Sequence, residues 1–187
     1  MKTPVVLVVG PAGTGKSTAS HILARRLRAA HLDKDAVTRR FVEAMLKSQG
    51  LPEGDRESRY YQDVCHPLEY DTLVATAVEV ARAGCPVVMD APFGVQLANV
   101  IWWRQFSTAL AAIGAHPTVL LLSVPSDEWR TRVVARGAIR DTGKLANWQA
   151  FAGDLPTIAE GIPVVQVSNA GTRADLDARL AILAGDL

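Results

Sequence analysis

The chain has 187 residues and a formal net charge of +1, with 49% hydrophobic and 21% charged residues. This length suits one domain, and the balance of apolar and charged residues is typical of a globular protein and excludes general disorder. The longest apolar run, Pro4–Val9, is far shorter than the roughly 18 residues that cross a bilayer. Because no secretory-signal pattern is present either, we expect a cytoplasmic protein without a membrane span.

Strand and helix patterns alternate along the chain. Apolar runs of strand length lie at Pro4–Val9, Pro86–Met89, Thr118–Val124 and Pro163–Val167. Helical spacing predicts helices at Lys16–Ala30, Tyr70–Ala83, Gln96–Ile113, Ser126–Arg136 and Arg173–Leu183. Continuous apolar strands separated by helices indicate a single α/β domain with an open parallel sheet. His31 and Leu32 weakly indicate one further strand before Asp33.

The segment after the first predicted strand carries the most specific motif. It reads GPAGTGKST and fits Gly-x4-Gly-Lys-Ser/Thr between a Val-rich strand and a helix. Glycines let backbone N–H groups turn toward phosphates, and the helix N-terminus adds a favourable partial charge. Lys16 is expected to reach the β and γ phosphates, and Ser17 to ligate Mg²⁺. We predict that ATP binds through Gly10, Ala12, Gly13, Thr14, Gly15, Lys16, Ser17 and Thr18.

Charge is concentrated near this motif. Residues 1–40 hold eight basic and two acidic side chains, so the rest of the chain carries a net charge of −5. A local positive field attracts a compact polyphosphate or a nucleic acid, and the nearly neutral chain as a whole favours the polyphosphate.

Two aspartates follow the first predicted helix after a short connection. Asp33 and Asp35 lie where a second strand would end beside the phosphate loop, so either carboxylate is placed to accept a proton from an attacking hydroxyl. The alternative is structural, because Asp is a good N-cap and Asp35 precedes a helix that would start at Ala36.

Asp90 ends the apolar run Val87–Met89. A carboxylate at the carboxyl end of a buried strand lies at the crevice where α/β sheets bind ligands, and it suits a magnesium site shared with Ser17. The alternative is a carboxylate that ends the strand in a turn.

Three arginines follow one another at intervals of four residues. Arg132, Arg136 and Arg140 are placed to close over ATP on a lid around residues 130–148 and to neutralise charge as the phosphoryl group moves. The alternative is a solvated helix face on which Glu128 and Arg132 form an i,i+4 pair. Arg130 is expected to face solvent.

Two further segments are candidates for ligand contacts. The turn that begins at Asn169 is placed to hold adenine, although Thr172 in the same turn also suits an ordinary N-cap. Between residues 51 and 90, the candidate acceptor-binding side chains are Tyr60, Tyr61, His66 and Tyr70. Trp102 and Trp103 are expected mainly to pack in the core, with an acceptor pocket as the alternative.

The chain resembles the small P-loop kinases grouped with chloramphenicol phosphotransferase, the zeta-toxin kinases and the kinase domain of polynucleotide kinases, an AAA-type ATP-binding group. The similar segments are GPAGTGKST, LDKDAV, VVMDAPFG, RTRVVARGAIRDTGKL and the final strand that runs into SNAGT. The resemblance implies a five-stranded parallel sheet in the order 2-3-1-4-5, flanked by helices and topped by a lid.

The resemblance also implies roles for individual residues. Asp35 matches the catalytic base, Lys16 the phosphate lysine, Arg132 the arginine near adenine, and Arg136 and Arg140 the lid arginines. The second strand is shorter here than is usual in the group, so the choice between Asp33 and Asp35 stays open.

Together these patterns predict an ATP-dependent kinase, a monomer or a homodimer, that phosphorylates a hydroxyl of a metabolite, nucleoside or antibiotic. The alternatives are a P-loop ATPase or nucleotide switch without an acceptor, and a kinase of nucleic-acid 5′ ends. Residues 51–90 hold eight acidic and three basic side chains, which argues against a polynucleotide partner.

Overall fold

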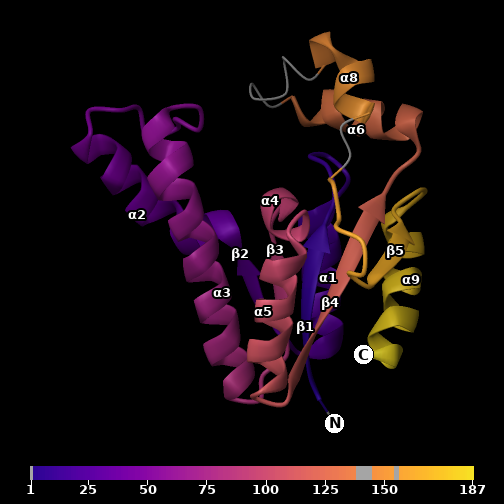
Figure 1. Ribbon diagram of the computed structural model, residues 1–187. Helices are drawn as coiled ribbons and strands as arrows, with labels where there is room; N and C mark the ends of the chain where they lie inside the picture. The colour runs from indigo at the N-terminus through magenta and orange to yellow at the C-terminus, as the bar shows by residue number, and fades with distance from the viewer. Residues whose placement is uncertain (1, 138–144, 154–155) are drawn as a thin grey trace.

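The computed structural model describes residues 2–137, 145–153 and 156–187 around a central five-stranded sheet (Figure 1). Its strands are β1 (Thr3–Val9), β2 (Ala30–Asp33), β3 (Val87–Asp90), β4 (Ala115–Ser123) and β5 (Val164–Ser168). The order is β2-β3-β1-β4-β5, and every neighbouring pair is parallel. This confirms the expected fold class and strand order, including the weakly indicated strand before Asp33.

Helices cover both faces of the sheet (Figure 1). On one face lie α3 (His66–Arg82) and α5 (Val100–Ala111), and on the other lie α1 (Lys16–Leu27) and α9 (Arg173–Asp186). The remaining helices are α2 (Lys34–Ser48), the π-helix η1 (Tyr61–Cys65), α4 (Gly94–Leu97), α6 (Ser126–Arg136) and α8 (Trp148–Gly153). Among the described residues, no helix combines the length and the apolar character needed to span a bilayer.

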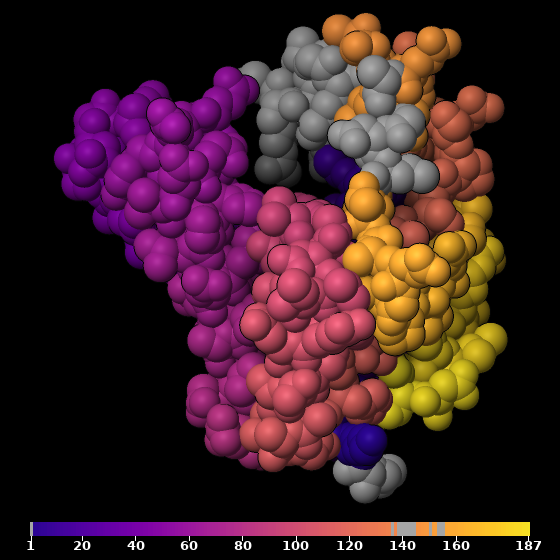
Figure 2. Space-filling model, viewed as in Figure 1, coloured from indigo at the N-terminus to yellow at the C-terminus, as the bar shows by residue number. Residues whose placement is uncertain are grey.

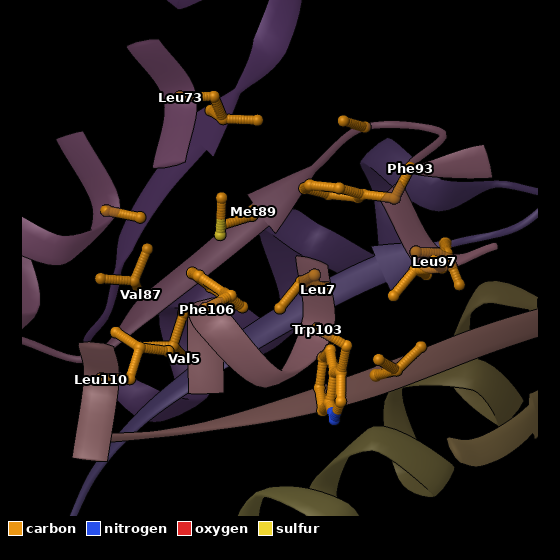
Figure 3. Packing of buried hydrophobic residues seen from close by; sticks show 14 of the residues in the cluster. Val5, Leu7, Leu73, Val87, Met89, Phe93, Leu97, Trp103, Phe106 and Leu110 are labelled. Carbon is orange, nitrogen blue, oxygen red and sulfur yellow. The ribbon is translucent and has the colours of Figure 1, made fainter. Parts of the chain in front are cut away.

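Side chains on the two faces of β1 belong to two separate apolar clusters. Val5 and Leu7 point to the face covered by α3 and α5, whereas Val6 and Val8 point to the face covered by α1 and α9. Figure 3 shows the first cluster, in which aromatic and aliphatic side chains from α3, α4 and α5 pack against β1 and β3. Each fully buried side chain of this kind stabilises the fold by about 1.5–3 kcal/mol. The sheet that carries the site is therefore fixed from both sides.

The first helix is shorter than predicted. It ends at Leu27 because Arg28 adopts a left-handed conformation with φ of 51°. The N–H of Ala29 then bonds the carbonyl of Ala24 at 2.8 Å, which turns the chain back and lets β2 start at Ala30.

The predicted helix Gln96–Ile113 is two helices. The chain breaks between α4 and α5 at Asn99, whose side chain accepts hydrogen bonds from the N–H groups of Ile101 at 2.9 Å and Trp102 at 3.2 Å. The apolar spacing continues across this break, so a periodicity argument joins two helices that an N-cap separates.

A further part of the structure, which we call the α2–α3 arm, consists of α2, η1 and the first half of α3. It projects beyond the sheet on the side of β2 (Figure 1). The arm has a small apolar cluster of its own, formed by Val42 and Leu46 of α2 with Tyr61 and Cys65 of η1. Its position at the carboxyl end of β2 places the start of α2 beside the phosphate loop.

Candidate active site

The loop between β1 and α1 has the conformation that its glycines were predicted to supply. Gly13 and Gly15 have φ values of 87° and 91°. A side chain at Gly15 would collide with the amide nitrogen of Asn169, and one at Gly13 would lie 2.5 Å from a methyl group of Val133. Both positions therefore require glycine for conformation and for space.

Three side-chain hydrogen bonds hold this loop in place. Asn169 donates through Nδ2 to the carbonyl oxygen of Thr14 at 2.7 Å, and Trp129 donates through Nε1 to that of Ala12 at 2.8 Å. The Thr14 hydroxyl donates to the carbonyl oxygen of Pro11 at 2.9 Å. Asn169 is buried, so the side chain predicted to mark an adenine-binding turn supports the phosphate loop here.

The role of Trp129 was not predicted, because a single tryptophan on a helix carries no spacing signal. The nearby Thr172 caps α9 with its hydroxyl, and Asp175 completes a reciprocal capping box. The alternative of an ordinary N-cap at Thr172 is therefore confirmed.

Lys16 extends across the mouth of the loop. Its Nζ donates to the carbonyl oxygens of Gly10 at 2.8 Å and Pro11 at 3.0 Å. The ammonium group thus lies where the backbone turns inward, as expected for a lysine that contacts phosphate oxygens.

Ser17 and Asp90 meet at the carboxyl edge of the sheet. Asp90 is 4% exposed, and burial raises the pKa of its carboxyl group, although a hydrogen bond from Ser17 acts in the opposite direction. Its Oδ2 is buried without a hydrogen-bond partner among the described protein groups, and His31 Nε2 is 4.0 Å away. A buried carboxylate oxygen next to a hydroxyl is a suitable ligand pair for Mg²⁺, which keeps several waters and phosphate oxygens in its shell.

The two aspartates at the start of α2 have different environments. Asp33 caps the helix, because its Oδ1 accepts a hydrogen bond from the N–H of Ala36 at 2.7 Å. Asp35 lies in the first turn with its side chain 62% exposed, and its Oδ1 is 2.9 Å from Lys34 Nζ. The expected alternative, in which Asp35 caps a helix starting at Ala36, is wrong, since α2 begins at Lys34 and Asp33 provides the cap.

These groups line one cleft of about 390 Å³. Figure 2 shows the hollow between the α2–α3 arm and the uppermost helices, with part of the N-terminal segment visible inside it. The cleft is lined by residues of the phosphate loop, the start of α2, the end of β3 and α6: Ala12, Gly13, Gly15, Lys16, Ser17, Thr18, Asp33, Lys34, Asp35, Asp90, Ala91, Pro92 and Arg132.

Arg132 reaches the cleft from α6. Its Nη2 lies 2.5 Å from Glu128 Oε1 and 3.2 Å from the carbonyl oxygen of Gly171. The i,i+4 pair that was the alternative interpretation is therefore present, and it also joins α6 to the loop after β5. Arg130 is exposed, as expected.

The two other predicted arginines are only partly covered by the structure. Arg136 is the last residue of α6, and the structure describes its backbone alone. Arg140 and the central part of the predicted lid, residues 138–144, lie outside the described residues.

Two of the four predicted acceptor-side aromatic residues are buried, and the other two, Tyr60 and His66, are partly buried. Tyr70 is buried, accepts a hydrogen bond from the N–H of Phe93 at 3.3 Å, and has its pKa raised by burial to about 12. Tyr61 is also buried, and burial together with a hydrogen bond to Glu69 raises its pKa. Trp103 packs in the core as expected.

Ala91 and Pro92, which directly follow Asp90, line the cleft instead of these aromatic residues in the part of the chain that the structure describes. The sequence signal for these two residues is that they directly follow Asp90. Nothing else in the sequence favours them over the aromatic residues as lining of the cleft.

A family model described as an AAA domain matches residues 5–155 of the chain. No curated protein matches the chain significantly.

Solved structures share the fold along the whole chain. A candidate kinase from Chloroflexus aurantiacus aligns with a TM-score of 0.67 and 21% identity over 100% of both chains. A sugar kinase from a Janibacter species has a TM-score of 0.61 and 18% identity over 100% of this chain and 95% of its own. The APS kinase of Mycobacterium tuberculosis, solved with AMPPNP and APS, has a TM-score of 0.52 and 14% identity over 100% of this chain and 99% of its own. At these identities the likeness establishes the P-loop kinase-like fold.

Proposed function

The chain belongs to the AAA domain family, and we propose that it is an ATP-dependent kinase that phosphorylates a hydroxyl of a small molecule. Nucleotide binding follows from its P-loop. The observation that carries the proposal is the position of Asp35, whose exposed carboxylate opens onto the same cleft as Lys16, Ser17 and the buried Asp90. A proton acceptor and a phosphate-binding loop in one cleft are the components of phosphoryl transfer.

The phosphate loop and the magnesium site would prepare the nucleotide. Backbone N–H groups of the loop surround the phosphates, and Lys16 places a positive charge at the β and γ phosphates. Ser17 and Asp90 would hold Mg²⁺ directly or through water, and the ion would neutralise charge on the β and γ oxygens. These groups lie in the loop after β1, at the start of α1 and at the end of β3, and together they would fix the position of the γ phosphate.

In the transfer step, the acceptor oxygen attacks the γ phosphorus and forms a new O–P bond. The bond between the γ phosphorus and the oxygen that bridges to the β phosphate breaks, and ADP leaves with that electron pair. Asp35 accepts the proton of the attacking hydroxyl. Arg132, with Arg136 and Arg140 of the predicted lid, would neutralise negative charge that builds up during transfer.

Two observations support a small acceptor. The segment 51–90 beside the cleft holds eight acidic and three basic residues, so its field repels a polynucleotide. The cleft also has a volume of only about 390 Å³, and two proteins with the same fold act on small molecules, a sugar in one case and APS in the other. We propose that the chain lies closest in activity to the group that contains chloramphenicol phosphotransferase, whose motifs it resembles.

The test is a panel of sugars, sugar acids, nucleosides and hydroxylated antibiotics incubated with ATP and Mg²⁺, scored by mass spectrometry for the addition of one phosphate. The Lys16→Ala variant, purified in parallel, controls for contaminating kinases. A product formed by the wild type and absent with the variant supports the proposal. Transfer to the 5′ hydroxyl of an oligonucleotide alone would identify a nucleic-acid kinase.

A further inference from the structure

The α2–α3 arm contains a buried carboxylate that apolar packing does not explain. Glu69 on α3 is 0% exposed, and both of its carboxylate oxygens accept hydrogen bonds. Oε1 accepts hydrogen bonds from Lys34 Nζ at 2.7 Å and the Thr38 hydroxyl at 3.0 Å, and Oε2 accepts one from the Tyr61 hydroxyl at 2.6 Å. A buried ion pair is often no better for stability than well-packed apolar residues. The apolar cluster of the arm already joins α2 to η1, which runs directly into α3, so this pair is not the sole contact that holds α2 in place among the described residues.

The partner of Glu69 leads directly to the cleft. The Lys34 side chain is 11% exposed and lines the cleft, and its Nζ is 2.9 Å from Asp35 Oδ1 as well as 2.7 Å from Glu69 Oε1. A single ammonium group therefore connects a buried carboxylate to the exposed carboxylate beside the phosphate loop. It does so in the first turn of α2, where the helix dipole disfavours a positive charge, so the position is not explained by helix formation.

We propose that Lys34 and Glu69 are positioning residues for the phosphoryl-transfer step, in which Glu69 fixes Lys34 and Lys34 fixes the side-chain orientation of Asp35. This inference rests on the proposed function. Asp35 is mostly exposed, so packing in the core restricts its rotamers little, and the bond to Lys34 adds a restriction that depends on where Glu69 holds the ammonium group.

A merely structural pair makes a different prediction. If Lys34 and Glu69 only joined α2 to α3, their loss would lower thermal stability and leave both the Asp35 rotamer and the rate of the folded enzyme unchanged. The distinguishing readouts are therefore the χ1 rotamer of Asp35 and the division of any defect between kcat and KM.

The experiment compares the wild type with Glu69→Gln and Lys34→Met. Glu69→Gln is nearly isosteric and keeps one acceptor oxygen, and its NH₂ group is able to donate to the Tyr61 hydroxyl oxygen, so it remains testable if Lys34→Met, which leaves a buried carboxylate unpaired, fails to fold. Glu43→Gln is the matched control, because it removes a carboxylate from the partly exposed pair with Arg39 on α2. Three-bond couplings in labelled protein report the Asp35 rotamer, and the transfer assay reports kcat and KM for ATP.

We expect one Asp35 rotamer in the wild type and in the control variant Glu43→Gln, and averaged rotamers in Glu69→Gln and Lys34→Met. We expect kcat to fall about 10- to 100-fold in those two variants, the size of a misplaced catalytic group, with KM for ATP nearly unchanged. A single unchanged rotamer in Glu69→Gln, or a lower melting temperature with unchanged kcat, overturns the inference. If the rotamer depends on Glu69 but the wild type phosphorylates no acceptor, the positioning holds and the proposed function fails.

Discussion

The phosphate loop and the start of the α2–α3 arm line the same cleft but are built by different kinds of contact. The loop is made from nine consecutive residues whose backbone turns inward at glycines, with a lysine and a serine at fixed spacing. The start of the arm is held by contacts such as the one between Lys34 and Glu69, which are 35 residues apart and meet only in the folded chain. The side of the cleft formed by the loop is thus encoded locally, and the side formed by the arm is encoded by long-range side-chain contacts.

This difference predicts unequal effects of mutation on the two sides. Changes in the loop should affect every reaction of the nucleotide, including hydrolysis, whereas changes at the start of the arm should affect mainly transfer to the acceptor. The predictions below separate these two outcomes, beginning with the largest expected effect.

Lys16→Ala should abolish ATP turnover, with a loss of about 1,000-fold or more, because the β and γ phosphates lose the charge that orients them. Release of ADP, measured with and without acceptor, checks this prediction. Arg25→Ala, which removes a cation from the exposed side of α1, is the matched control and should turn over ATP normally. Wild-type turnover in Lys16→Ala would contradict the assignment of the loop as the phosphate site.

Asp35→Asn should lower phosphoryl transfer by roughly 100-fold or more while ATP affinity is retained, as for a lost general base. Asp33→Asn is the matched comparison, because Asn also serves as an N-cap and leaves the start of α2 intact. Transfer rates and ATP dissociation constants of both variants decide the assignment. A defect confined to Asp33→Asn would move the base by two positions, and equal loss of ATP affinity in both would make them magnesium-site residues.

Arg136→Ala and Arg140→Ala should each lower the rate of transfer about 10- to 100-fold and change ATP affinity less, since lid arginines act mainly on charge present in the transition state. Arg130→Ala, on the exposed side of the same helix, should behave as wild type. Separate measurement of kcat and KM checks the prediction. Variants that lose only thermal stability would support the solvated-helix interpretation instead.

Asn169→Ala should have the smallest effect on the transfer step, because Asn169 holds the loop backbone at Thr14 and is assigned no part in the transfer itself. Loss of its hydrogen bond leaves the Thr14 carbonyl unsatisfied and costs about 1–3 kcal/mol, which corresponds to a melting temperature lower by roughly 2–4 °C per kcal/mol. ATP should bind about tenfold more weakly as the loop loosens. Calorimetry and ATP titration measure both effects, and an unchanged melting temperature would show that the hydrogen bond does not stabilise the loop.

The contrast between local and long-range contacts also explains what the sequence could predict. The phosphate loop follows from motif spacing, and the site of Asp90 follows from the position of a carboxylate at a strand end, whereas the strand order was implied by the resemblance to the small P-loop kinases. The break at Asn99 and the choice of Asp33 as cap were missed or left open because they depend on single hydrogen bonds within a continuous apolar or acidic pattern.

Of the residues predicted to line the cleft, the aromatic ones agree least with the structure. Tyr61 and Tyr70 lie in the segment that was expected to bind the acceptor. The Tyr61 hydroxyl instead donates to the buried Glu69, and the Tyr70 ring packs against Phe93. The burial of an aromatic ring and the pairing of Lys34 with a distant carboxylate are set by tertiary packing, which residue spacing does not encode.

The most direct test of the central claim is ³¹P NMR of the wild-type protein with ATP, Mg²⁺ and an acceptor from the panel. Transfer predicts that ADP and a phosphate monoester of the acceptor appear in equal amounts, with little inorganic phosphate. ADP accompanied by inorganic phosphate alone, with every acceptor in the panel unchanged, would contradict the claim and identify the protein as an ATP hydrolase.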